Sequence, residues 1–106
     1  MNEPYAEIEP EIEGLKGPVL LDFGTNWCGH CRRAQPLVDA AVAKHPRVRH
    51  LKIADASGRR LGRAFGVKRW PTLVFLRDGE ELARLVRPQD EAQIGQALQK
   101  IETGGV

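Results

Sequence analysis

Two cysteines constrain this chain more than any other feature of its sequence. Cys28 and Cys31 are the only two cysteines in its 106 residues, and they stand between an apolar run and a segment with helical periodicity. A disulfide between them closes a very short loop, which removes little entropy from the unfolded chain. Small secreted scaffolds use several cysteines spread along the sequence instead. The pair therefore indicates chemical reactivity at the junction of a strand and a helix.

The segments on either side of the cysteines have clear periodicities. Residues 18–23 form an apolar run that ends at Gly24, which is typical of a buried strand. After the cysteines, apolar residues recur with the spacing of one helix face. They are Ala34, Leu37, Val38, Ala41 and Val42. We expect Pro36 to kink this helix and His45-Pro46 to end it.

The rest of the chain continues the alternation of strands and helices. Its clearest segments are strands at 48–54, 72–77 and 81–86 and helices at 57–65 and 90–101. Ser57-Gly58 is expected to open the shorter helix and Gly66 to close it. Asp78-Gly79 predicts a tight antiparallel hairpin between the last two strands. Weaker signals predict an edge strand at 5–8 and a broken helix at 11–16.

This order of elements predicts an α/β fold. Strands that alternate with helices favour a mostly parallel sheet with helices on both faces, and the hairpin adds an antiparallel edge. The length suits one hydrophobic core and is too short for two. We therefore expect a single domain over residues 1–106, with a central mixed sheet of four to five strands.

Composition and charge narrow the possible partners. No stretch approaches the roughly 18–20 apolar residues that a membrane span needs. The amino terminus is acidic, unlike a signal peptide, so we expect a cytoplasmic protein with no membrane attachment. Five cations and no acid lie within Arg59–Arg69, although the formal net charge is only +2. This stretch lacks the repeated aromatic residues of single-strand binders, so we interpret it as a solvated face and expect no nucleic acid.

The position of the cysteines suggests how they react. A thiol is a good nucleophile only as thiolate, and the amino end of a helix stabilises that anion through free amide hydrogens and the helix dipole. Cys28 stands at the start of the expected helix, and Cys31 lies one turn inside it. We expect Cys28 to attack a substrate disulfide and Cys31 to resolve the mixed disulfide, with Arg32 and Arg33 adding positive charge nearby.

Several motifs, in order and spacing, resemble the thioredoxin family over nearly the whole chain. They are Asp22-Phe23, Trp27-Cys28-Gly29-His30-Cys31, Pro36 and Trp70-Pro71-Thr72. The resemblance implies a thioredoxin fold and a protein-disulfide oxidoreductase that acts most often as a reductant. It implies no bound cofactor beyond a redox-active Cys28–Cys31 disulfide, protein disulfides as substrates, and a reductase as electron donor. We expect a monomer, since no large apolar surface stripe is evident.

The resemblance also assigns roles to single residues. Pro71 would be in the cis form and face the cysteines, with the backbone of Trp70 pairing with an extended substrate segment. Trp27, Gly29, His30 and Thr72 would support substrate binding around the cysteines. Asp22 would be a buried carboxyl behind Cys31 with Lys52 near it. Burial favours a partly protonated acid, which can take the proton that Cys31 must lose.

Three positions depart from the usual family pattern. His30 stands where ordinary thioredoxins have proline and disulfide isomerase domains have histidine, which predicts a less reducing couple. Trp70 replaces a smaller aliphatic residue and would either reshape the substrate groove or cap the core. Arg87-Pro88 stands where the family commonly has glycine. With Arg69 and the helix at Arg59–Arg63, it predicts a basic rim that favours acidic protein substrates.

Other interpretations remain open at this stage. A zinc or iron–sulfur site needs more ligands than one cysteine pair, and His45 and His50 read as surface residues, so we expect no metal. A non-catalytic binding module would usually lose a cysteine. Among enzymes, an oxidant or isomerase is the alternative to a reductant. A reducing cytosol favours the dithiol form and therefore the reductant.

Overall fold

The computed structural model describes residues 4–56 and 59–104, and the strands come first because they position the cysteines. One sheet holds four strands in the spatial order β2-β1-β3-β4. Their bounds are β1 Pro18–Gly24, β2 Arg49–Ala54, β3 Thr72–Arg77 and β4 Glu80–Val86. All four lie close to their expected positions, and the mixed α/β sheet is confirmed.

The helices also follow the sequence pattern in the main. They are the 3-10 helix η1 Ile12–Gly14 and the α-helices α1 Gly29–Ala43, α2 Arg60–Ala64 and α3 Glu91–Thr103. Helix α1 continues through Pro36. The short helix α2 begins later than expected, and Ser57 and Gly58 lie outside the described residues. The expected edge strand at 5–8 reduces to a single bridge between Ala6 and Ile53.

The expectation of a mostly parallel sheet is wrong. Among the four described strands, β1 and β2 pair in parallel, whereas β3 is antiparallel to both β1 and β4. A parallel crossover must carry the chain back along the whole strand, about 20 Å here. In the described part of the connection over residues 55–71, the one helix is the five-residue α2, which rises about 7.5 Å. The chain therefore enters β3 at the end of the sheet where β2 finished.

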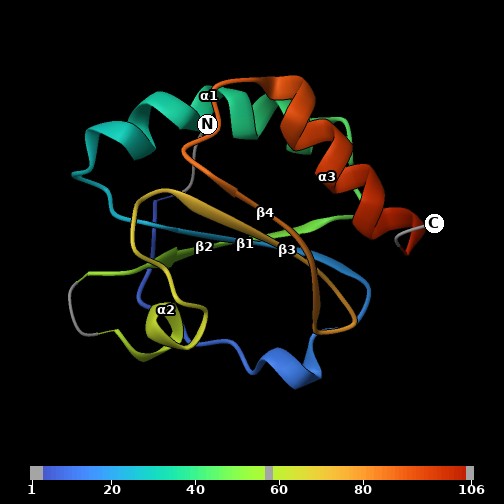
Figure 1. Cartoon of the computed structure of the whole chain (residues 1–106), viewed down its shortest axis with the longest axis horizontal. Helices are drawn as coiled ribbons and strands as arrows, with labels where there is room; N and C mark the ends of the chain where they lie inside the picture. The colour runs from blue at the N-terminus through green and yellow to red at the C-terminus, as the bar shows by residue number, and fades with distance from the viewer. Residues whose placement is uncertain (1–3, 57–58, 105–106) are drawn as a thin grey trace.

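Helices cover both faces of the sheet, as expected. Figure 1 shows α1 and α3 together on one side and α2 with η1 on the other. Two buried clusters fill these layers, one between the sheet and α1 and α3, the other beneath η1 and α2. A third, smaller cluster holds Tyr5, Cys28 and Cys31 at the edge of the core. No helix in the described ranges is both long and apolar enough to span a bilayer.

The hairpin between β3 and β4 confirms the turn expected from the sequence. Asp78 and Gly79 have φ angles of 51° and 83°. Two consecutive positive φ values fit a type I′ turn, whose twist matches that of the flanking strands. The Asp78 carboxylate also accepts a hydrogen bond from the backbone of Gly17 at 2.8 Å, which ties the turn to the start of β1.

Candidate active site

The two cysteines lie at the junction between the end of β1 and the start of α1. Cys28 is the N-cap of α1, and its Sγ accepts a hydrogen bond from the Cys31 backbone N–H at 3.4 Å. Both residues are free thiols. Cys28 is 8% exposed and Cys31 1% exposed. Cys28 is therefore less open than the sequence suggested, because Trp70 packs against it, yet it remains the more accessible sulfur.

Gly24, at the end of β1, makes room for the cysteines. A Cβ atom at this position would lie 2.6 Å from Cys31 Sγ and 2.7 Å from Cζ of Tyr5. Real Cβ atoms do not approach other atoms that closely, so the site requires glycine here. The residue that ends the first strand thereby fixes how near α1 and the amino-terminal segment come to the sheet.

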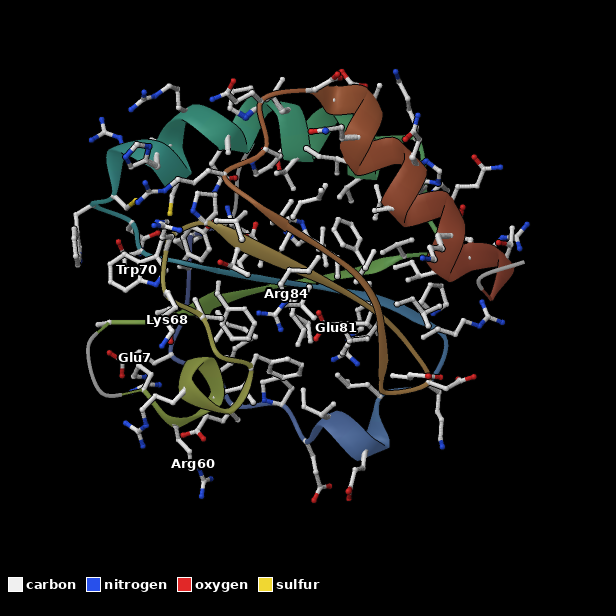
Figure 2. The ribbon with its side chains drawn as sticks, viewed as in Figure 1. Glu7, Arg60, Lys68, Trp70, Glu81 and Arg84 are labelled. Atoms are coloured by element: carbon white, nitrogen blue, oxygen red, sulfur yellow. The ribbon has the colours of Figure 1, made fainter. Side chains whose placement is uncertain are left out.

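The loop before β3 faces the cysteines. The Trp70–Pro71 peptide bond is cis, as the family resemblance implied. The Trp70 carbonyl oxygen lies 4.0 Å from Cys28 Sγ, and the Thr72 hydroxyl donates to the Arg69 carbonyl at 2.6 Å. Figure 2 shows Trp70 below the amino end of α1, beside the yellow sulfur atoms. The loop before β3 therefore brings Trp70 into contact with the cluster that holds the two cysteines.

Two contacts fix the indole of Trp70. Its Nε1 donates to Asp55 Oδ2 at 2.9 Å, and its ring meets that of Trp27 edge to face at 5.5 Å between centroids. Trp27 itself is 69% exposed. Burial raises the pKa of Asp55, while the Trp70 hydrogen bond and the charge of Arg59 lower it. Trp70 both packs against the cysteines and forms part of the exposed surface beside them.

Asp22 is buried behind Cys31, as the resemblance implied. It is 1% exposed, and the Tyr5 hydroxyl donates to its Oδ1 at 2.7 Å. His50 Nε2 lies 2.9 Å from its Oδ2. Lys52 is the register neighbour of Asp22 on β2, and its Nζ lies over the Tyr5 ring, 4.9 Å from the centroid.

Sequence reasoning missed two members of this cluster. Tyr5 was expected only as part of a weak strand, and no local pattern points to its role. His50 was expected at the surface, but its side chain is only 13% exposed and pairs with Asp22. One signal pointed to it: His50 and Lys52 lie two residues apart on one strand, so their side chains share a face of the sheet.

The electrostatics of Cys31 suit a thiol that reacts second. Burial raises its pKa to about 12, and the hydrogen bond and charge of Cys28 add to the rise. The Thr25 backbone and the Tyr5 hydroxyl oppose this rise in the pKa of Cys31, because both favour its thiolate. Cys31 therefore keeps its proton at neutral pH, and its attack on another sulfur requires a base.

A cavity of about 490 Å³ lies beside α1, and His30, between the two cysteines in sequence, contributes to its wall with Arg33 and Arg87. Arg87 has a φ angle of 51°, in the region that favours glycine, and its Nε donates to the Trp70 carbonyl at 2.9 Å. The positive charge of Arg87, with smaller contributions from desolvation and Arg33, lowers the pKa of His30. His30 is therefore mainly neutral at pH 7.

The expected basic rim is narrower than the sequence suggested. Arg59 lies 3.7 Å from the carboxylate of Glu7, and Arg60 lies 3.3 Å from that of Glu9. Figure 2 shows Glu7 and Arg60 on the side of the molecule where α2 lies. Because the acidic amino-terminal segment folds against α2, part of the charge asymmetry along the sequence cancels in space. The cations nearest the cysteines are Arg33 and Arg87, which line one cavity with His30, and Arg32, which lines another with Cys31.

The described residues contain no cluster of three or more histidine, cysteine or acidic side chains suited to a metal ion. His45, which was expected at the surface, is partly buried. Its Nδ1 lies 2.7 Å from Glu102 Oε1, far along the chain from both cysteines.

This chain is similar to known proteins over nearly its whole length. The family model described as Thioredoxin matches residues 5–100. Thioredoxin from Chlamydia muridarum is 36% identical over 79% of this chain and 82% of its own length. The solved structure of thioredoxin 2 from Pseudomonas aeruginosa PAO1 in its reduced form is 48% identical, with a TM-score of 0.86 over 99% of this chain and all of that one. Protein disulfide-isomerase A3 from Gallus gallus is 32% identical over 90% of this chain but only 19% of its own length.

Proposed function

This chain belongs to the thioredoxin family and is a thiol–disulfide oxidoreductase, and from this we propose that it reduces protein disulfides with Cys28 as nucleophile and Cys31 as resolving thiol. The observation that carries the assignment of roles is the difference between the two sulfurs. Cys28 caps α1 and lies near the Trp70 carbonyl, whereas Cys31 is buried with a raised pKa. The first sulfur can meet a substrate, and the second can meet only its neighbour.

The reaction proceeds in two exchanges. The Cys28 thiolate attacks one sulfur of the substrate disulfide, which forms a mixed disulfide and releases the other substrate sulfur as thiolate. Cys31 then loses its proton to Asp22 and attacks Cys28 Sγ. This forms the Cys28–Cys31 disulfide and releases the second substrate thiolate. A reductase then supplies two electrons and two protons to restore the dithiol.

We assign the active-site sequence Cys28-Gly29-His30-Cys31 as the redox centre, in one domain over residues 1–106 that acts as a monomer without a bound cofactor. Trp27, Gly29 and Thr72 shape the surroundings of the cysteines, and Lys52 supports Asp22. A reducing compartment such as the cytoplasm keeps the dithiol form dominant and makes reduction the favoured direction.

One assay tests the activity itself. The purified protein with dithiothreitol as electron donor should precipitate insulin by reducing its interchain disulfides, well above the rate with dithiothreitol alone. A redox titration against glutathione, with alkylation of the free thiols and mass spectrometry, should show one two-electron couple confined to Cys28 and Cys31. No activity above background would instead support a non-catalytic binding module.

An oxidant or isomerase remains the second candidate, and His30 is the observation that favours it. We expect His30→Pro to make the protein more reducing, by about 30 mV or less at pH 7, a minor part of the roughly 90 mV between thioredoxin and disulfide isomerase. The effect is small because the lowered pKa keeps His30 neutral there. The imidazolium appears only as pH falls through that pKa. The difference between variant and wild type should therefore widen as the pH falls below the usual histidine range, and equal potentials throughout would exclude a role for His30.

The cations of the α1-side cavity suggest acidic protein substrates. We expect Arg87→Gly to raise KM about tenfold for an acidic peptide disulfide and to weaken its salt dependence. Stability should change by no more than about 1 kcal/mol, because glycine relieves the left-handed conformation while one hydrogen bond is lost. Lys100→Gln removes the same charge near the end of α3 and should leave KM unchanged. If both variants raised KM equally, the preference for acidic substrates would depend on the net charge of the protein and not on the position of Arg87.

A further inference from the structure

The hydroxyl of Tyr5 lies between the resolving thiol and the buried acid. It donates to Asp22 Oδ1 at 2.7 Å, which leaves the hydroxyl oxygen free to accept a proton, and Tyr5 packs with Cys31 in one buried cluster. Its oxygen and Cys31 Sγ lie 2.8 Å and 2.6 Å from the place where a Gly24 Cβ would stand. On the far side of the acid, His50 Nε2 lies 2.9 Å from Asp22 Oδ2. The groups thus form a continuous line from Cys31 to His50.

We propose that Tyr5 and His50 are positioning residues for the resolving step: Tyr5 relays the Cys31 proton to Asp22, and His50 carries it from Asp22 toward solvent. This inference rests on the proposed roles of Cys28 and Cys31. It extends the assignment of Asp22 and Lys52 as the relay by naming the groups on each side of the acid.

Tyr5 is held in this place by more than its ring. Asn26 Oδ1 accepts a hydrogen bond from the Tyr5 backbone N–H at 2.8 Å, and Asn26 Nδ2 donates to the Tyr5 carbonyl at 3.1 Å. The next residue, Ala6, bonds to the backbone of β2 at 3.1 Å and 2.8 Å. The amino-terminal segment is therefore clamped to the loop before Cys28 and to the sheet, so the hydroxyl is directed at the site.

The proton balance needs no additional reactant. The Cys31 S–H passes its proton to the Tyr5 oxygen while the Tyr5 O–H passes its own to the Asp22 carboxylate. The products are the Cys31 thiolate, an unchanged tyrosine and a protonated Asp22. Burial and the neighbouring Asp22 raise the pKa of Tyr5 far above its usual range, so a free tyrosinate does not form and the two transfers occur together.

His50 connects Asp22 to a cavity through which the proton can reach solvent. It lines a cavity of about 410 Å³ with Asp39 of α1 and Lys52 of its own strand. A second cavity, of about 200 Å³, adjoins Tyr5 and Cys31 and is lined by Arg32 of α1 and Lys52. The charged and titratable groups around the relay are therefore Cys28, Arg32, Asp39 and Lys52. Water in the second cavity can replace a missing hydroxyl in part, which limits the expected effect of removing it.

A two-phase experiment isolates the resolving step. An aromatic disulfide, 5,5′-dithiobis(2-nitrobenzoate), reacts with Cys28 and releases one thionitrobenzoate, and the attack of Cys31 releases the second. We expect Tyr5→Phe to leave the first phase unchanged and to slow the second about tenfold at pH 7, the low end of general acid–base effects. The slowed phase should regain rate as pH rises and hydroxide deprotonates Cys31. Its solvent deuterium isotope effect should also differ from that of the wild type.

Two histidine variants complete the test. His50→Gln retains an N–H for Asp22 but cannot carry the proton, and it should slow the second phase several-fold. His45→Gln removes a comparable histidine–carboxylate pair, with Glu102, and should leave both phases unchanged. A second phase at the wild-type rate and pH dependence in folded Tyr5→Phe and in His50→Gln would overturn the relay. A wild-type protein without a second phase would contradict the proposed function instead.

Discussion

Cys31→Ser is expected to convert this protein from a catalyst into a trap for its substrates. The Cys28 thiolate can still attack a disulfide, but a serine hydroxyl is far too weakly acidic to displace the captured sulfur. The mixed disulfide at Cys28 should therefore persist instead of being resolved. Insulin reduction should fall by about a thousandfold or more, since removing a group that acts as part of a unit costs nearly the whole activity.

The matched variant is Cys28→Ser, and the two should differ in kind. Cys28→Ser should lose as much activity yet form no adduct, because Cys31 is 1% exposed and cannot meet a protein disulfide. Non-reducing electrophoresis followed by mass spectrometry of the adduct measures both outcomes and identifies the partners. If Cys28→Ser accumulated adducts and Cys31→Ser did not, the roles assigned to the two sulfurs would have to be exchanged.

The elements of the fold could be predicted because their signals are local. The apolar run at 18–23, the one-sided helix after Cys31 and the Asp78-Gly79 turn are each encoded within a few neighbouring residues. The reactive cysteine pair could also be predicted, since its spacing and its place before a helix imply its chemistry. The direction of β3 could not be predicted in this way, because it depends on where the loop over residues 55–71 returns the chain to the sheet.

The remainder of the site depends on contacts between distant segments. Tyr5 and Asp22 are 17 residues apart in sequence, and His50 and Asp22 are 28 apart. No periodicity links such positions. Nothing in the sequence therefore pointed to the tyrosine, and the histidine had only its place two residues before Lys52 as a signal, whereas Asp22 was reached through the family resemblance. The predicted basic rim was too broad for the same reason, because it also depends on contacts between distant segments. Glu7 and Glu9 neutralise part of α2 only once the amino-terminal segment folds against it.

Gly24→Ala should produce the largest loss of stability among simple substitutions at this site. The added Cβ would lie within 2.6 Å of Cys31 Sγ and 2.8 Å of the Tyr5 hydroxyl, both of them buried. Overfilling a packed core costs about 1–3 kcal/mol, and we expect about 2–3 here because two groups must move at once. The melting temperature should then fall by roughly 10–20 °C.

Gly95→Ala is the control, because it adds the same methyl group where it meets nothing within 4 Å. Gly95 lies inside α3, so alanine there should raise stability by about 0.5–1 kcal/mol. Thermal and denaturant unfolding of both variants measure the difference.

A further comparison locates the clash. If Cys31 Sγ causes much of it, Cys31→Ala should recover more than about 1 kcal/mol of the Gly24→Ala cost in the double variant, a departure from additivity expected only for residues in contact. Strict additivity would mean that the strain falls on Tyr5 instead. In that event Gly24→Ala should displace the hydroxyl and slow the resolving step as Tyr5→Phe does. A Gly24→Ala protein as stable as the wild type would contradict the close packing of strand, helix and amino-terminal segment on which the relay depends.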